Sequence, residues 1–470
     1  MGAIAHMRSV VRTPYAWCTF IVAAEAVLIL WPLGQSQGSL LGVDGADYNQ
    51  YALNLVRHGV FSNAVSAPFY PGVTRTPGYP AFLALIHLIG LHFTQLTRLA
   101  QFALVAVLGC LVYGIALELA DVRSARISAA LIVTYLPFLW YATHALTEVL
   151  ASVLATLLVF LLVKARKRPT SVRLWIAVGL TLAAGAYVRP EVAGLGVLVA
   201  LGVLLTGRGR YVSRSRLLSP AIVLATMVVA LAPWMIRNVS VAHSFVPLDA
   251  SSGYDLLASA DQYAGTIHYE ITDADWTRFN VQANAIIARV EPKDLANAIT
   301  LRVEPKYPTA REQVAANNAL TRQALKIMSH LSVGTVLKGV PRRLAYLWGT
   351  ADVYPQGRSW STVAHRLAQL QYALLVVLIL AGIVMRRRLL AKEWPLWIIA
   401  AYLTVLHLVS HVEARYTLPA RAPLFVYAGV AVAAVVGWIG RATAQSSSRR
   451  RSRSESGQYV RIHGRFTPAV

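Results

Sequence analysis

Long apolar runs alternate with short polar loops along most of the chain. The first run extends from Tyr15 to Leu33, and nine more follow it. The later runs are Leu99–Leu119, Ile127–Thr143, Val149–Val163, Leu174–Val188, Val192–Leu205, Ala221–Ile236, Leu367–Met385, Trp394–His411 and Leu424–Ile439. Apolar runs of roughly 15–22 residues can cross the hydrocarbon core of a bilayer. The pattern therefore predicts an all-α polytopic membrane protein with about ten full transmembrane helices.

A further apolar stretch, Tyr79–Phe93, is interpreted differently. It has about 15 residues, which is marginal for a full span. Counting it as a span would place Arg123 and Arg126 outside and move every later basic loop to the wrong side of the membrane. We therefore expect a re-entrant or interfacial helix here.

The basic residues set the expected topology. They cluster in alternate loops and in the C-terminal tail, as the positive-inside rule predicts for cytoplasmic segments. The clusters are Arg123 and Arg126; Lys164, Arg166, Lys167, Arg168 and Arg173; Arg208, Arg210, Arg214 and Arg216; Arg386, Arg387, Arg388 and Lys392; and Arg449, Arg450, Arg451 and Arg453. With these segments inside, both termini are cytoplasmic and the ten helices alternate without conflict.

Composition supports this interpretation. The 470 residues are 56% hydrophobic and 14% charged, with a mean hydropathy of +0.52, which is too apolar for a soluble protein of this length. The net charge of +23 is explained by the basic loops, so we expect no nucleic-acid partner. Cys18 and Cys110 both fall in apolar runs and are expected to be buried thiols.

The chain divides into four parts. Residues 1–237 form an N-terminal transmembrane module whose first outer loop is 34–98. Residues 238–366 have balanced charge and several prolines, and they predict a small outer-side helical subdomain. Residues 367–440 contain the C-terminal transmembrane helices, and the Ser- and Arg-rich segment 441–470 predicts a disordered cytoplasmic tail.

The first outer loop carries the strongest candidate chemistry. Asp44 and Asp47 precede Tyr48 in a short interfacial helix, where either carboxylate could take a proton from a hydroxyl. Arg75 lies in the turn Arg75-Thr-Pro-Gly-Tyr-Pro, which includes Tyr79 and holds the guanidinium in place for a phosphate. The structural alternatives are a helix cap for Asp44 and a headgroup-contacting anchor for Arg75.

Other charged residues lie at helix ends on the same predicted outer side. Each arginine alone is typical of an interfacial anchor, but several on one face indicate an anionic site. The candidates for phosphate binding or pocket support are Glu148, Arg189, Glu191, Arg237, Arg415 and Tyr416.

Metal and nucleotide sites have weaker signals. His407 and His411 are at helical spacing, but the HExxH pattern is absent, so we assign no metal ligands and leave a divalent metal open as a cofactor. The sequence has neither GxGxxG nor a phosphate-binding loop, so a nucleotide donor is not indicated.

In this order, the motifs resemble those of integral-membrane glycosyltransferases of the GT-C fold. The similarity is to the protein O-mannosyltransferase and aminoarabinose-transferase group and to RgtA/B/C/D-like glycosyltransferases. It is carried by Asp44-x-x-x-Tyr48-x-x-x-Ala52, Arg75-Thr-Pro-Gly-Tyr-Pro, Thr147-Glu148, Arg189-Pro190, Pro233-Trp234 with Arg237-Asn238, Phe245-Val-Pro247, and Arg415-Tyr416 with Pro419.

The resemblance implies a polyprenyl-phosphate sugar donor, a hydroxyl acceptor and a catalytic Asp in the first outer loop. Asp44 fits that position best, and Asp47 is the second candidate. It also implies a bacterial inner-membrane protein whose active site faces the periplasm or the exterior, in contact with membrane lipids.

Two other functions stay open. One is a transporter or flippase of a lipid-linked or anionic substrate, although such proteins tend to have internal repeats and broken midplane helices, which the sequence does not show. The other is a non-catalytic lipid-binding scaffold. The sequence leaves open which sugar is moved, whether the acceptor is a lipid, glycan or protein, and the oligomeric state.

Overall fold

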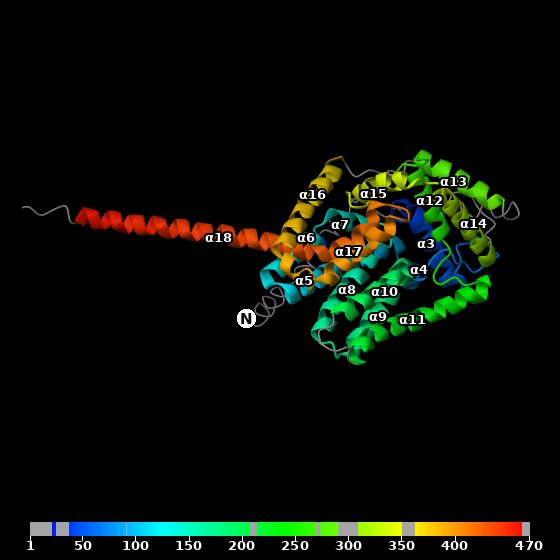
Figure 1. Cartoon of the computed structure of the whole chain (residues 1–470), viewed down its shortest axis with the longest axis horizontal. Helices are drawn as coiled ribbons and strands as arrows, with labels where there is room; N and C mark the ends of the chain where they lie inside the picture. Colours follow the sequence, from blue (N-terminus) through cyan, green and yellow to red (C-terminus); the bar gives the residue numbers. More distant parts are fainter. Residues whose placement is uncertain are drawn as a thin grey trace, which may run out of the picture.

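The computed structural model describes residues 21–24, 37–90, 92–206, 214–268, 273–289, 309–349 and 362–462. Every regular element in these ranges is a helix (Figure 1). The α-helices are α3 (Gln37–His58), α4 (Gly78–Leu88), α5 (Phe93–Leu119), α6 (Val122–Val133), α7 (Leu136–Ala142), α8 (Glu148–Lys167), α9 (Val172–Val188), α10 (Val192–Thr206), α11 (Arg214–Ala242), α12 (Ser252–Ala264), α13 (Asp273–Ala288), α14 (Ala310–Ser329), α15 (Val333–Leu347), α16 (Thr362–Met385), α17 (Trp394–His407) and α18 (Leu418–Ile462).

The transmembrane body is a bundle of apolar helices around one core. Phe102 of α5, Leu162 of α8 and Phe425 of α18 are buried together in this core. Small residues allow close helix approach, as is common in membranes. A Cβ atom added at Gly382 of α16 would lie 2.1 Å from the carbonyl oxygen of Tyr427 in α18. The all-α polytopic prediction is confirmed.

The number of spans differs from the simple count of apolar runs. Five helices of the described residues are long and apolar enough to cross a membrane, or six if the bent pair α6–α7 crosses as one span. Helices α4, α9, α10 and α17 are apolar but shorter. The predicted first span, Tyr15–Leu33, lies outside the described residues except for 21–24. Ten full spans therefore stays a prediction.

We expected the run Ile127–Thr143 to form one transmembrane helix, but its helix is not continuous. It is broken between α6 and α7, which are bent by 50° relative to each other. Pro137 lies in the first turn of α7. It has no N–H to bond to the Val133 carbonyl oxygen, and its ring would clash with that carbonyl if α6 continued without a break. Tyr135 at the break is fully buried beside Phe138 and Phe425, and Gln371 bonds to the Thr134 carbonyl oxygen and the Leu136 N–H on either side of it.

Helix α4 has 11 residues and is therefore about 16 Å long, too short to cross a bilayer. This agrees with the interpretation of Tyr79–Phe93 as a re-entrant or interfacial piece. Helix α3 precedes it and bends at Gly42, whose φ of 53° is in the left-handed region that favours glycine. The bend lies two residues before Asp44, and Gly45 just after it packs closely against Ala145.

The basic loops gather at one end of the bundle. Lys164 and Lys167 at the end of α8 pair with Glu118 at the end of α5, at 3.0 and 2.6 Å. Arg386, after α16, donates to the carbonyl oxygen of Leu119 at 2.8 Å. Glu148 begins α8 and so lies about 30 Å from this basic end.

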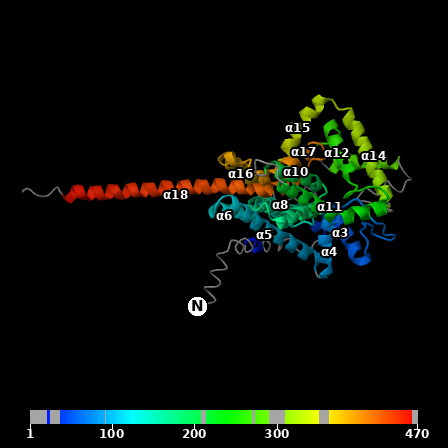
Figure 2. The same cartoon turned by 60° about the horizontal axis from the view of Figure 1, so that its bottom comes forward.

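The subdomain after α11 has its own core, in which Leu257 of α12, Phe279 of α13 and Leu320 of α14 are buried. Figure 2 shows α12, α14 and α15 at the end of the molecule away from the projecting part of α18. Arg343 of α15 is fully buried and donates to Ser259 Oγ at 2.9 Å and to the His407 carbonyl oxygen at 3.3 Å. This arginine ties the subdomain to α17.

The C-terminal segment continues α18 as far as the structure describes it. We expected disorder from 441; α18 extends to Ile462, residues 463–470 lie outside the described part, and the division of the chain that includes this tail stays a prediction. No proline interrupts 441–462, and Arg, Ala and Gln are good helix formers, so the backbone hydrogen bonds of α18 can continue beyond the apolar region.

The position of the basic loops predicts the membrane topology. Single cysteines at Arg166 and Arg387, in a variant lacking Cys18 and Cys110, should react with an impermeant thiol reagent only after the membrane is opened. A cysteine at the exposed Asn318 should react in intact cells or spheroplasts. Labelling of position 387 in intact cells would contradict the assignment.

Candidate active site

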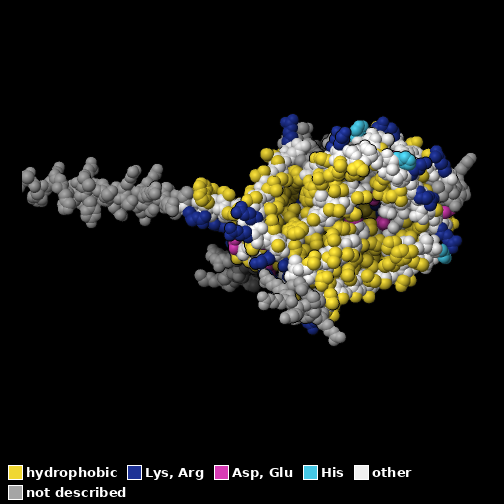
Figure 3. Space-filling view, in the orientation of Figure 1, with side chains coloured by type: hydrophobic (Ala, Val, Ile, Leu, Met, Phe, Trp, Pro, Cys, Tyr) yellow, Lys and Arg dark blue, Asp and Glu magenta, His cyan; other side chains and the backbone are white. Residues whose placement is uncertain are grey.

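A cavity of about 1040 Å³ lies between the subdomain and the end of the bundle opposite the basic loops, which we call the outer end after the predicted topology. Its walls come from α3, the Arg75 turn, the start of α8, the α9–α10 connection, helices α12 to α14 and the segment after α17. Figure 3 shows an opening with acidic side chains beside it, in a face that is otherwise covered by apolar side chains. A charged cavity in an apolar surface is expected where chemistry occurs at a membrane boundary.

The first outer loop contributes three charged side chains that contact one another. Arg75 Nε lies 2.6 Å from Asp47 Oδ2, and its Nη2 lies 3.3 Å from Asp44 Oδ1. The Arg75 guanidinium lies 4.8 Å from the centre of the Tyr48 ring. Asn63 donates to the second oxygen of Asp47 at 3.1 Å. Asp47 thus has both oxygens bound and positions Arg75.

The C-terminal half of the chain completes the group. Arg415 Nη1 lies 3.0 Å from Asp44 Oδ2 and 3.6 Å from Glu148 Oε1, and its Nε donates to Glu413. Asp44 is therefore held between Arg75 and Arg415. Its side chain keeps 27% exposure, compared with 6% for Asp47.

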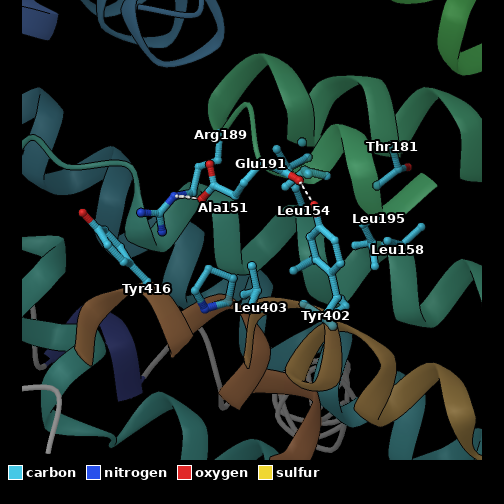
Figure 4. A pocket seen from close by; sticks show the side chains of 15 residues that line it. Ala151, Leu154, Leu158, Thr181, Arg189, Glu191, Leu195, Tyr402, Leu403 and Tyr416 are labelled. Carbon is cyan, nitrogen blue, oxygen red and sulfur yellow. Dashed lines mark hydrogen bonds and ion pairs between the residues drawn. The ribbon is translucent and has the colours of Figure 1, made fainter. Parts of the chain in front are cut away.

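Arg189 is the third arginine that lines the cavity, after Arg75 and Arg415. Its Nε lies 2.9 Å from Glu191 Oε1, and its guanidinium lies 5.2 Å from the centre of the Tyr416 ring. Its Nη1 is buried and has no partner among the described residues. Figure 4 shows these side chains at the mouth of a small apolar pocket of about 30 Å³ between α8, α9, α10 and α17. Arg189 therefore has a free donor where the charged cavity meets the apolar bundle.

The charges change the pKa values of the outer-loop groups. Burial alone would raise the pKa of Asp44, but Arg415 and Arg75 outweigh it, and the pKa lies below its usual value. Burial raises the pKa of Tyr48 to about 12, so Tyr48 stays protonated. The cavity thus holds an ionised Asp44 beside a neutral phenol that can form hydrogen bonds.

Two predicted site residues lie elsewhere. Tyr79 is fully buried behind Tyr48, with ring centres 5.2 Å apart, and its hydroxyl accepts from Gln101 at 2.9 Å. Arg237 does not line the cavity; it donates to the Gly72 carbonyl oxygen at 2.6 Å. We expected Arg237 to bind phosphate, but its guanidinium is instead used to hold the loop that carries Arg75.

Asp249 and Asp255 line the cavity and were missed by the sequence analysis. The backbone N–H of Ala250 donates to the Val73 carbonyl oxygen at 2.7 Å, and this contact brings Asp249 beside the Arg75 turn. Burial raises the pKa of both aspartates to about 7, and for Asp255 the neighbouring Asp249 adds to the effect. No local sequence signal predicts a contact between residues so far apart in the chain.

The described residues do not favour a metal site. They contain no group of three or more His, Cys, Asp or Glu side chains that could hold a metal ion. Asp44 and Asp47 already contact Arg75, and Asp44 also contacts Arg415, so the charge of these carboxylates is balanced without a cation. We therefore derive no step that uses a metal.

Comparisons with known proteins give a family match over part of the chain and a similar fold. Residues 74–236 match the family model of dolichyl-phosphate-mannose-protein mannosyltransferase. No curated protein matches the sequence.

Solved structures give the fold. The apo oligosaccharyltransferase of Archaeoglobus fulgidus is 15% identical to this chain, with a TM-score of 0.54. The matched part covers 92% of this chain and 52% of the oligosaccharyltransferase chain. The A. fulgidus enzyme AglB, in complex with an inhibitory peptide and a dolichol-phosphate, is 16% identical with a TM-score of 0.52 and the same coverage. This chain therefore spans about half the length of those enzymes.

ArnT from Cupriavidus metallidurans, bound to undecaprenyl phosphate, is also similar. It is 16% identical, with coverage of 88% of this chain and 78% of its own, and its TM-score is only 0.38. The two oligosaccharyltransferase structures, whose TM-scores exceed 0.5, support the fold without it. The chain has the fold of the integral-membrane GT-C glycosyltransferases.

Proposed function

We propose that the protein is a membrane glycosyltransferase that moves a hexosyl or pentosyl group from a polyprenyl-phosphate donor to a hydroxyl acceptor. The observation that carries the proposal is the position of Asp44, which lies between Arg75 and Arg415 in a large cavity at the outer end of the bundle. We place the protein in a bacterial inner membrane with the cavity toward the periplasm or exterior. The similarity to AglB, whose structure holds a dolichol-phosphate, supports the donor class.

The arginines suit the donor phosphate. Guanidinium groups bind phosphate oxygens through paired donors, and their charge stabilises the phosphate as it becomes a leaving group. Arg189 has a buried Nη1 with no partner among the described residues, and it also lines the large cavity, so it can donate to a phosphate there while the lipid chain stays in the membrane. Arg75 and Arg415 lie beside Asp44, where the sugar carbon would react.

Asp44 is the candidate base. In the transfer step the acceptor oxygen forms a bond to the anomeric carbon, and the bond from that carbon to the phosphate oxygen breaks. The acceptor proton passes to Asp44, and polyprenyl phosphate leaves with the bonding pair. One direct displacement inverts the anomeric centre. Asp47 is less suited because its side chain is almost fully buried, with 6% exposure compared with 27% for Asp44.

The geometry also bears on the alternatives. Asp44 contacts Arg75 and Arg415, and no backbone N–H of the described residues donates to it, so a capping role is not supported. A transporter would need a broken helix along a polar path. The break between α6 and α7 is instead closed by Gln371, which bonds to the Thr134 carbonyl oxygen and the Leu136 N–H, and by the packing of Tyr135 against Phe138 and Phe425.

Replacing Asp44 tests the proposed base. Asp44→Asn keeps the size of the side chain but cannot accept the proton, so turnover at saturating donor should fall about 10²–10⁴-fold, while donor affinity falls little. Full turnover in Asp44→Asn together with loss in Asp47→Asn would move the base to Asp47.

The matched control is Asp121→Asn. Asp121 is exposed and caps the start of α6 by accepting from the backbone N–H of Arg123 and Ser124, at the basic end of the bundle. Asn caps a helix about as well as Asp, so this variant should keep the wild-type turnover.

Replacing Arg189 tests the proposed phosphate contact. Arg189→Lys keeps the positive charge but loses the forked donor set, so the Kd for polyprenyl phosphate should rise roughly 10–100-fold. Arg322→Lys, an exposed position on α14, should leave the Kd unchanged. Equal Kd values for the wild type and Arg189→Lys would show that the phosphate binds elsewhere.

A further inference from the structure

The two walls of the cavity differ in the groups they offer. The membrane-side wall contains the three arginines Arg75, Arg189 and Arg415, together with the five carboxylates that pair with them: Asp44, Asp47, Glu148, Glu191 and Glu413. The opposite wall, which we call the roof, is formed by the described residues of 247–321 that line the cavity, and none of these is Lys or Arg. Its polar side chains are two aspartates, amides and hydroxyl groups, which lie among aromatic rings and aliphatic side chains such as Leu256 and Leu320. Among these lining residues only the membrane-side wall offers guanidinium donors to a phosphate, so the roof is suited to a different part of the reactants.

Aromatic rings form one part of the roof. Trp276 of α13 and Tyr254 of α12 have ring centres 6.1 Å apart and an interplanar angle of 11°. Trp276 also contacts the His411 ring edge-to-face, with centres 5.8 Å apart. The indole thus lies where the roof meets the segment that carries Arg415. Aromatic faces in polar pockets pack against apolar surface of a ligand while the polar groups around them fix its orientation.

Polar groups of the roof have unused hydrogen-bonding capacity. Asn280 Oδ1 accepts from the Tyr254 hydroxyl at 2.8 Å, and Asn317 Oδ1 accepts from the Gly253 N–H at 2.7 Å. Their amide nitrogens have no partner in the described ranges of the chain. Asn284 Oδ1 is buried and also has none there. A buried oxygen such as Asn284 Oδ1 is costly unless something else binds it, and the two amide nitrogens are donors that a ligand can use.

Asp255 adds an acceptor to this set. It lines the cavity from the first turn of α12 and forms no ion pair with any described residue. Its raised pKa is consistent with a carboxyl group that has been taken from water without a cation to balance it. The roof thus offers amide donors, carboxyl acceptors and an aromatic face, and its two acids disfavour an anionic ligand.

We infer that the roof, formed by Tyr254, Asp255, Trp276, Asn280, Asn284 and Asn317, binds a carbohydrate acceptor. Each sugar hydroxyl both donates and accepts, which matches adjacent carboxyl and amide groups. The C–H face of a sugar ring packs on Trp276. A long-chain alcohol offers a single hydroxyl and would leave most of these groups unpaired. A phosphorylated acceptor would meet Asp249 and Asp255 instead of a cation.

The size of the cavity allows this arrangement. Drug-sized ligands occupy pockets of roughly 300–1,000 Å³, so about 1040 Å³ exceeds what one donor sugar needs. The acceptor saccharide would bind the roof, and its reacting hydroxyl would point toward Asp44 on the opposite wall. This inference rests on the proposed function and specifies its acceptor as a neutral glycan.

The test uses the purified full-length protein with labelled polyprenyl-phosphate hexoses and pentoses as donors. Three kinds of acceptor are offered separately: octyl glycosides of common hexoses and pentoses, a peptide containing Ser and Thr, and dodecanol. We expect transfer to a glycoside and to neither of the others. Transfer to the peptide or dodecanol without transfer to any glycoside would overturn the inference.

Two variants locate the acceptor. Asp255→Asn keeps the shape of the carboxyl group, and Asn317→Asp keeps the acceptor for Gly253 but removes the amide donor. Each should raise the KM for the glycoside about tenfold while donor affinity stays constant, the scale of one hydrogen bond to a buried or charged group. The control Asn318→Asp is exposed on the same helix and should keep the wild-type KM.

The outcomes separate the two proposals. An unchanged KM in both roof variants overturns the carbohydrate subsite but leaves the glycosyltransferase intact. Donor that binds and is hydrolysed without transfer to a glycoside also counts against the subsite alone. A protein that neither binds nor consumes any polyprenyl-phosphate donor would instead contradict the proposed function.

Discussion

The ion pairs of Asp44 with Arg75 and Arg415 are the interaction on which the outer end of the molecule depends. Asp44 and Arg415 are 371 positions apart in the sequence, so this contact closes the bundle between its first outer loop and the start of α18. Charges near a membrane are costly unless they are paired. Here each carboxylate beside an arginine lowers that cost, and the cluster can exist only when both halves of the chain are folded together.

Other contacts hold the cluster in position without entering it. Arg237 bonds to the backbone of Gly72, and the Val73–Ala250 hydrogen bond fixes the same loop to the subdomain. Arg343 fastens α15 to the end of α17, four residues before His411. The reactive side chains are therefore close in space because contacts between segments far apart in the sequence hold their backbone in place. Such a scaffold reduces the motion of Arg75 and Asp44, which favours a preorganised site.

Much of this could be predicted from the sequence where the physics is local. Apolar runs predicted the helices, and basic loops marked the end of the bundle where Lys164 and Arg386 lie. Helix ends and the proline-rich turn identified Asp44, Arg75, Arg189 and Arg415 as candidates, and all four line the cavity. Each of these signals depends on residues within a few positions of one another.

Features that depend on tertiary contacts could not be predicted in this way. Arg237 has the same interfacial setting as the other arginines, but only its backbone partners show that it faces the loop. Asp249 and Asp255 carry no motif, and their place opposite Arg75 follows from a hydrogen bond between distant segments. The break at Tyr135 was missed because apolar content outweighed the effect of Pro137 in our interpretation.

The central claim is that this cavity transfers a sugar from a lipid phosphate. Its most direct test is to incubate the purified protein with radiolabelled polyprenyl-phosphate sugars and an extract of envelope glycans, and to follow label in each fraction over time. The account predicts that label moves from the lipid to a glycan while polyprenyl phosphate accumulates in equal amount. Label that stays on intact lipid with every donor, while the protein remains folded, would contradict it.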